Sequence, residues 1–141
     1  MQKVIILTSG GSVAVAARLL AKAGTISGEV KQEAFPDGEI HHQLETPVDN
    51  SEVVVCGNFD FTQPDQTMEL FDVASLAADE GALGLTLITP EDRRADKHTR
   101  FFRRVQARFL SAIPETPLGN RVLPVDEQAM SMPVYRKPAT R

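Results

Sequence analysis

Short apolar runs alternate with longer amphipathic segments along the chain. Residues 3–8 form a β-branched run that stops at the Ser9-Gly-Gly-Ser12 turn, and residues 53–56 and 85–88 are similar runs. Apolar runs of this length, bounded by Gly, Ser or Pro, are typical of strands buried on both faces. Residues 122–125 predict one more short strand.

Three segments between these runs repeat their apolar residues at helical spacing. We expect helices over residues 12–23, 64–80 and 97–112. Gly24 and Gly81 follow the first two, as a C-terminal glycine commonly does. In the third, Phe101, Phe102, Val105 and Phe109 form an apolar stripe, across from Arg100, Arg103, Arg104 and Arg108.

Residues 29–35 and 39–45 are predicted to pair as a β-hairpin around Phe35-Pro-Asp-Gly-Glu39. Proline presets one backbone dihedral of such a turn and glycine accepts a positive φ. The order is then strand, helix, three strands, helix, strand, helix, strand. This order predicts an α/β fold, with a mainly parallel sheet flanked by helices on both faces and the hairpin as an antiparallel addition.

Composition indicates one globular domain. The chain has 141 residues, 42% of them hydrophobic, which is enough for a buried core. We expect the domain to cover residues 1–135 and the polar residues 136–141 to fray. The longest apolar runs are too short to cross a bilayer, and the start carries no signal-peptide pattern. Cys56 is the single cysteine, so no intrachain disulfide can form, and we expect a cytoplasmic protein.

Charge is divided unevenly within the net value of -4. Residues 1–89 contain four Lys or Arg residues and thirteen Asp or Glu residues, whereas residues 90–108 contain seven and three. A basic segment on an acidic body is able to bind phosphate-bearing ligands or to contact the acidic part of a second copy. The alternative is an ordinary solvated helix face.

Several other positions are candidates for a phosphate, metal or reactive-thiol site. The Ser9-to-Ser12 turn stands where α/β proteins bind phosphate, but it lacks the glycine patterns of a dinucleotide or P-loop site, and such turns also simply reverse the chain. His41 and His42 are neighbours on a strand and point to opposite faces, so they do not chelate one ion. Cys56 stands among valines and is expected to pack in the core. No residue is predicted to bind a metal or to act in catalysis.

The Phe35-to-Glu39 turn presents an aromatic ring and two carboxylates. Phe35 is able to stack on a purine, while Asp37 and Glu39 are able to accept hydrogen bonds from its ribose or amino group. Considered alone, the turn is more typical of an ordinary hairpin than of a nucleotide contact.

Several motifs occur in the order found in the ribose-phosphate pyrophosphokinases (phosphoribosyl pyrophosphate synthetases). Phe35-Pro-Asp-Gly-Glu39 is followed by Pro64, Met68-Glu69-Leu70, an alanine-rich helix and a strand ending at Pro90. The chain resembles the amino-terminal domain of that family over residues 3–90, and more weakly as far as Arg121-to-Asp126 and Val134.

The resemblance implies a phosphoribosyltransferase-like fold and a site for ATP with Mg²⁺ between subunits. In the family, pyrophosphate passes from ATP to ribose 5-phosphate. Phe35 would stack on adenine, and Asp37 and Glu39 would accept hydrogen bonds. The resemblance also implies a homo-oligomer, a dimer or larger.

The chain departs from the family where the triphosphate is handled. The family's Arg-Gln pair is missing after Pro90, and Arg93 or Arg94 would have to replace it. The family's histidine after Asp126 is also missing, because Glu127 and Gln128 follow instead. No Asp-x-Gly-rich ribose-phosphate loop occurs before the sequence ends at residue 141. We therefore expect an isolated chain without synthetase activity.

Three functional hypotheses follow. The first is a non-catalytic homologue that binds nucleotide, oligomerises or regulates a full-length synthetase. The second is an enzyme subunit that makes phosphoribosyl pyrophosphate together with a partner chain that supplies the second domain. The third is a binder of an acidic partner or of nucleic acid through the arginine face of residues 100–108, although the acidic overall charge and the lack of interleaved aromatic residues disfavour nucleic acid.

Overall fold

The computed structural model describes residues 3–9, 13–22, 24–59, 64–90 and 99–125. Within these ranges, five strands form a parallel sheet in the order β2-β1-β5-β6-β7, and two strands form a separate antiparallel hairpin. The strands are β1 (Val4–Thr8), β2 (Thr25–Ser27), β3 (Val30–Ala34), β4 (Ile40–Leu44), β5 (Glu52–Cys56), β6 (Gly84–Pro90) and β7 (Asn120–Val125). The helices are α1 (Val13–Leu20), α2 (Pro64–Asp79) and α3 (Thr99–Ser111). The predicted α/β fold is confirmed.

Strand β2 was not predicted. It has three residues, begins directly after Gly24 and pairs with β1 at an edge of the sheet. Its side chains are exposed or half-buried, so it carries no apolar run that sequence periodicity would detect. The other predicted helices and strands are present.

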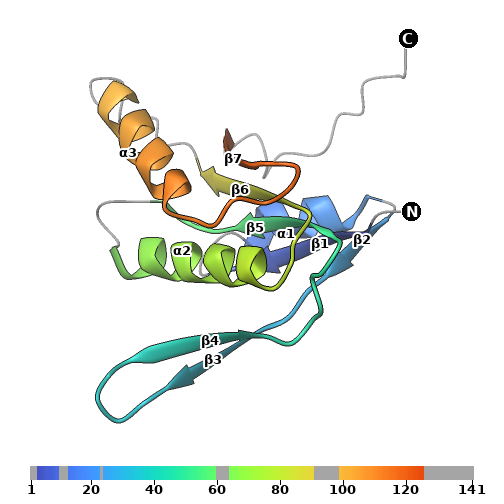
Figure 1. The fold of residues 1–141 in the computed structure, drawn as a ribbon, viewed down its shortest axis with the longest axis horizontal. Helices are drawn as coiled ribbons and strands as arrows, with labels where there is room; N and C mark the ends of the chain where they lie inside the picture. The colour runs from blue at the N-terminus through green and yellow to red at the C-terminus, as the bar shows by residue number, and fades with distance from the viewer. Residues whose placement is uncertain (1–2, 10–12, 23, 60–63, 91–98, 126–141) are drawn as a thin grey trace.

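The sheet separates two apolar layers because successive side chains of a strand point to opposite faces. Ile5, Leu7 and Val55 face the larger core, against α2 and α3. Ile6 and Cys56 face the other side, against α1. Figure 1 shows the helices on the two faces of the sheet, which confirms the predicted layers.

The hairpin β3–β4 extends away from this body alongside α2 (Figure 1). Its base is anchored by Leu44, which is buried in the larger core, and by Val30, which packs against that core. Beyond its base, the hairpin offers mainly exposed side chains. The turn between its strands is therefore displayed at a distance from the sheet.

None of the described helices has the length and apolar character that a membrane crossing requires.

Candidate functional site

The turn at the hairpin tip, residues 35–39, is held in shape by its own hydrogen bonds. The Phe35 N–H donates to the Glu39 carbonyl at 2.8 Å, and the Gly38 N–H donates to the Phe35 carbonyl at 2.9 Å. Asp37 Oδ1 accepts from the Glu39 N–H at 3.0 Å. Gly38 has φ of +89°, a conformation that favours glycine. Local chemistry thus brings Phe35, Asp37 and Glu39 together, as the sequence predicts.

His41 links two of these three side chains. Its ring meets the Phe35 ring edge to face, with centroids 4.5 Å apart and an interplanar angle of 74°. Its Nε2 lies 3.2 Å from Glu39 Oε1. Phe35 is still 41% exposed. The tip therefore displays an aromatic ring and two carboxylates whose positions are set by neighbours in the same hairpin.

The contacts of His41 at the tip were not predicted from the sequence, in which His41 was a candidate only as a metal ligand together with His42. Residues two apart on a strand share a face, so the spacing from Glu39 to His41 was the available signal. The prediction that the two histidines point to opposite faces agrees with their contacts: His41 meets the tip, whereas His42 meets α2.

A groove of about 740 Å³ lies between the hairpin and α2. This size falls in the range of small-molecule sites. Four carboxylate residues line it, and no Lys or Arg is among the described residues of its lining. These are Glu39 from the tip and Asp65, Glu69 and Asp72 from α2. The groove is therefore a negatively charged surface that continues from the tip along the helix.

His42 lies on the α2 side of this groove, with a side chain only 5% exposed. Its Nδ1 is 2.5 Å from Asp72 Oδ2, and its Nε2 is 3.6 Å from Glu69 Oε1. Both ring nitrogens thus face carboxylates of α2.

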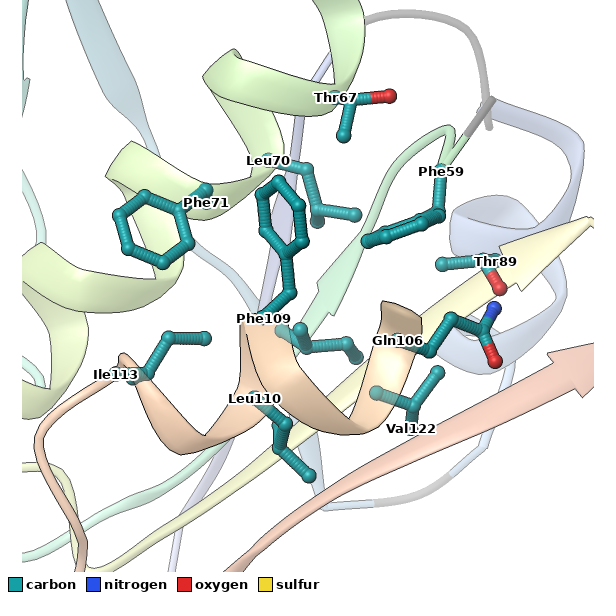
Figure 2. Close-up of a pocket in the computed structure, with 11 residues that line it drawn as sticks. Phe59, Thr67, Leu70, Phe71, Thr89, Gln106, Phe109, Leu110, Ile113 and Val122 are labelled. Carbon is teal, nitrogen blue, oxygen red and sulfur yellow. The ribbon is translucent and has the colours of Figure 1, made fainter. Parts of the chain in front are cut away.

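A second cavity lies between α2, α3 and the sheet (Figure 2). It measures about 10 Å³, no more than one water molecule requires. Phe109 is one of the lining residues, and its ring centroid lies 5.0 Å from that of Phe59 and 5.6 Å from that of Phe71. The lining also contains Gln106, whose buried Nε2 has no hydrogen-bond partner among the described residues. This cavity is part of the core rather than a ligand site.

The carboxyl edge of the sheet is the other place where α/β proteins bind ligands. Helix α1 follows β1 on one face and α2 follows β5 on the other, so the gap between β1 and β5 is a topological switch point. Ser9 lies there with a buried Oγ that has no hydrogen-bond partner in the described part of the chain. Residues 10–12 lie outside the described residues, so phosphate binding by this turn stays a prediction.

Cys56 is fully buried, as predicted from its valine neighbours. Burial raises the pKa of its thiol to about 11, which disfavours the reactive thiolate.

The predicted arginines are only partly described. Arg93 and Arg94 lie outside the described residues. Arg104 and Arg108 are exposed on α3, and Val105 and Phe109 of the predicted apolar stripe pack against the core.

Comparisons with known proteins address the fold. No family model matches the chain, and no curated protein matches it. Among solved structures, the crystal structure of phosphoribosylpyrophosphate synthetase from Mycobacterium smegmatis is similar, with a TM-score of 0.69 and 18% sequence identity. The match covers 89% of this chain and 43% of that chain, so this chain spans less than half its length. At this identity the likeness establishes a phosphoribosyltransferase-like fold.

Proposed function

We propose that this chain is a nucleotide-binding domain, related to the amino-terminal half of a phosphoribosyl pyrophosphate synthetase, whose hairpin tip contacts ATP. The observation that carries the proposal is the exposed tip, where Phe35, Asp37 and Glu39 are held together by local contacts. A base stacks on Phe35, and the two carboxylates accept hydrogen bonds from its amino group or ribose. The fold similarity supports the relation to the synthetases.

The tip supplies only part of an ATP site. Residues 35–39 include no cationic side chain for the triphosphate. Within the described residues, no group of His, Cys, Asp and Glu is arranged to hold a metal ion. The proposed Mg²⁺ therefore has no ligand set on the described surface and would arrive bound to the phosphates. A second copy of the chain would complete the site, which connects nucleotide binding with the proposed homo-oligomer.

A non-catalytic role is the form of the proposal that we favour. Within the part that it shares with the synthetases, the sequence lacks the family's Arg-Gln pair after Pro90 and its histidine after Asp126. Binding nucleotide without these groups suits an oligomerising or regulatory subunit. The alternative is an enzyme subunit whose partner chain supplies the second domain.

The tip is tested by calorimetric titration of ATP against wild type and single variants. Phe35→Ala is expected to weaken binding by about tenfold or more, because stacking of a base on an aromatic ring contributes about 1–3 kcal/mol. Asp37→Asn is expected to weaken it by about tenfold, because a charge-assisted hydrogen bond is lost. The asparagine oxygen still accepts from the Glu39 N–H, so the turn keeps its shape.

Gln43→Ala is the matched control, since Gln43 is exposed on β4, the strand that follows the tip. It is expected to bind ATP as wild type does. Equal affinity of all four proteins would remove the tip from the site. Molar mass measured by light scattering in the same samples tests whether the binding species is an oligomer.

Catalysis separates the two forms of the proposal. We expect no phosphoribosyl pyrophosphate from ATP and ribose 5-phosphate with the chain alone. If the chain alone forms phosphoribosyl pyrophosphate, the non-catalytic proposal is wrong. If phosphoribosyl pyrophosphate forms only after addition of a second polypeptide, the enzyme-subunit alternative is favoured.

A further inference from the structure

His42 contacts α2 at a distance from the hairpin base. In strands β3 and β4, Leu44 is buried, Val30 and His42 are half-buried, and the other residues are exposed. Val30 and Leu44 are cross-strand partners at the base, next to the core. His42 lies two residues farther toward the tip, and its side chain is 5% exposed. The contact of His42 with Glu69 and Asp72 therefore helps to hold the outer hairpin against the helix.

The surroundings of His42 suit an imidazolium ring. Asp72 Oδ2 lies 2.5 Å from Nδ1, and Glu69 Oε1 lies 3.6 Å from Nε2. Nε2 is buried and has no hydrogen-bond partner among the described residues. A neutral imidazole carries one N–H, so one nitrogen would turn a lone pair toward a carboxylate. An imidazolium carries two N–H groups and a positive charge, so it donates to Asp72 and is attracted by the Glu69 carboxylate at ion-pair distance.

We propose that protonation of His42 docks the hairpin onto α2, and that loss of this proton releases the hairpin. In the protonated state one positive ring stands between two carboxylates of the same helix. In the neutral state the ring loses the ionic attraction to both carboxylates, and a buried lone pair faces one of them, which favours exposure of the ring to water. The device concerns hairpin position and does not depend on ATP binding.

The charges around His42 give the direction of the effect. From α2, Glu69 and Asp72 face it, and Asp65 of α2 and Glu39 of the tip line the same groove. Its partner on β3 is the neutral Gln32, and its own strand contributes only His41 on the opposite face. Carboxylates are ordinarily ionised above about pH 5. Histidine ordinarily changes charge between about pH 5 and 8. Between these carboxylates, docking is therefore favoured by the charged ring and weakens when the ring loses its proton.

Release of the hairpin would move the tip. Glu39 precedes His42 by three residues, and a strand rises about 3.3 Å per residue, so the tip lies within about 10 Å of this contact. The position of Phe35, Asp37 and Glu39 relative to the body then follows the protonation of His42. This device would regulate the proposed nucleotide contact.

Distance measurement between two spin labels tests the proposal without nucleotide. One label is attached through Glu33→Cys, on the exposed outer face of β3, and the other through Asp79→Cys, at the exposed end of α2. Cys56 is fully buried and is not expected to react. We expect one narrow distance distribution at about pH 5.5 and a broader one at about pH 8.5. The population at the docked distance is expected to be smaller at about pH 8.5 than at about pH 5.5.

Variants of the two histidines show which imidazole ring causes the pH dependence of the distance distribution. His42→Gln is expected to give the same distribution at both pH values, whereas His41→Gln, the matched control, keeps the wild-type response. Asp72→Asn removes one charge at a half-exposed position and is expected to reduce the response even if His42→Gln fails to fold. Identical wild-type distributions at the two pH values would overturn the proposal. A pH response retained in both folded His42→Gln and Asp72→Asn would also overturn it.

This result is distinguishable from the outcome of the ATP titration. A pH-dependent hairpin in a protein that binds no ATP would leave the docking device intact and remove the proposed function. If the protein binds ATP but its hairpin position does not depend on pH, the proposed function is supported and the docking device is overturned.

Discussion

Gly57 lies where β5 leaves the sheet, directly against the end of β1. Its N–H donates to the Ile88 carbonyl at 3.1 Å, so the backbone stays in the sheet. A Cβ at this position would overlap Ser9 Oγ and would stand 2.9 Å from Leu70 Cδ1. The two strand ends approach this closely because residue 57 has no side chain.

Gly57→Ala is therefore expected to lower the free energy of unfolding by about 1–3 kcal/mol, the usual cost of overpacking a core. Urea unfolding measures the change. Combining it with Ser9→Ala removes the overlapping hydroxyl, so the double variant should lose less than the sum of the single losses. A Gly57→Ala protein as stable as wild type would contradict the close approach.

Helix α2 serves the core with one face and the hairpin with another. Pro64 occupies its first position and Asp65 its first turn, both favourable at a helix start, and Gly81 follows its end with φ of +96°. Its buried residues are Thr67, Leu70, Val73, Ala74 and Ala77. Glu69 and Asp72 turn toward His42 instead. The helix thereby couples the sheet to the hairpin.

The two faces of α2 predict unequal effects of truncation. Leu70 is 1% exposed and Met68 is 56% exposed on the same helix. Leu70→Ala is expected to lower the free energy of unfolding by about 2–5 kcal/mol, because it leaves a cavity in the core. Met68→Ala, the matched control, should change it by no more than about 0.5 kcal/mol. Thermal or urea unfolding compares them, and similar losses would mean that α2 does not pack as described.

The molecule as a whole has an acidic groove beside α2 and exposed arginines on α3. Glu39, Asp65, Glu69 and Asp72 line the groove. Arg104 and Arg108 are exposed on α3. Attraction between the acidic groove of one copy and the arginines of another favours contact between copies of the chain, and so supports the homo-oligomer that we propose.

If charge contributes to this association, the molar mass in solution should depend on salt. Light scattering is expected to give a larger mass at about 0.1 M salt than at about 1 M, because the longer screening length leaves the attraction intact. Arg104→Glu combined with Arg108→Glu should lower the mass at low salt, and Arg18→Glu on the opposite side of the sheet serves as the control. A mass independent of salt and of both arginines would argue against charge-driven contact.

Local periodicity and turn chemistry were enough to predict most of the fold and the composition of the tip. The apolar runs of β1, β5 and β6 and the repeats of α2 are short-range patterns, and the Pro-Asp-Gly sequence specifies its turn within five residues. Phe35, Asp37 and Glu39 meet because they are neighbours in that turn. Whether they contact a nucleotide stays a prediction.

Contacts between distant residues were not predictable in this way. Strand β2 is recognised by its pairing with β1, since its three residues have no apolar pattern. His42 and Asp72 are 30 positions apart, and nothing in either segment specifies the other. Their meeting requires the hairpin to fold back alongside α2, which depends on how Val30 and Leu44 are buried at its base. Strand and turn propensities act over a few residues, whereas burial of apolar surface brings together whichever segments share the core.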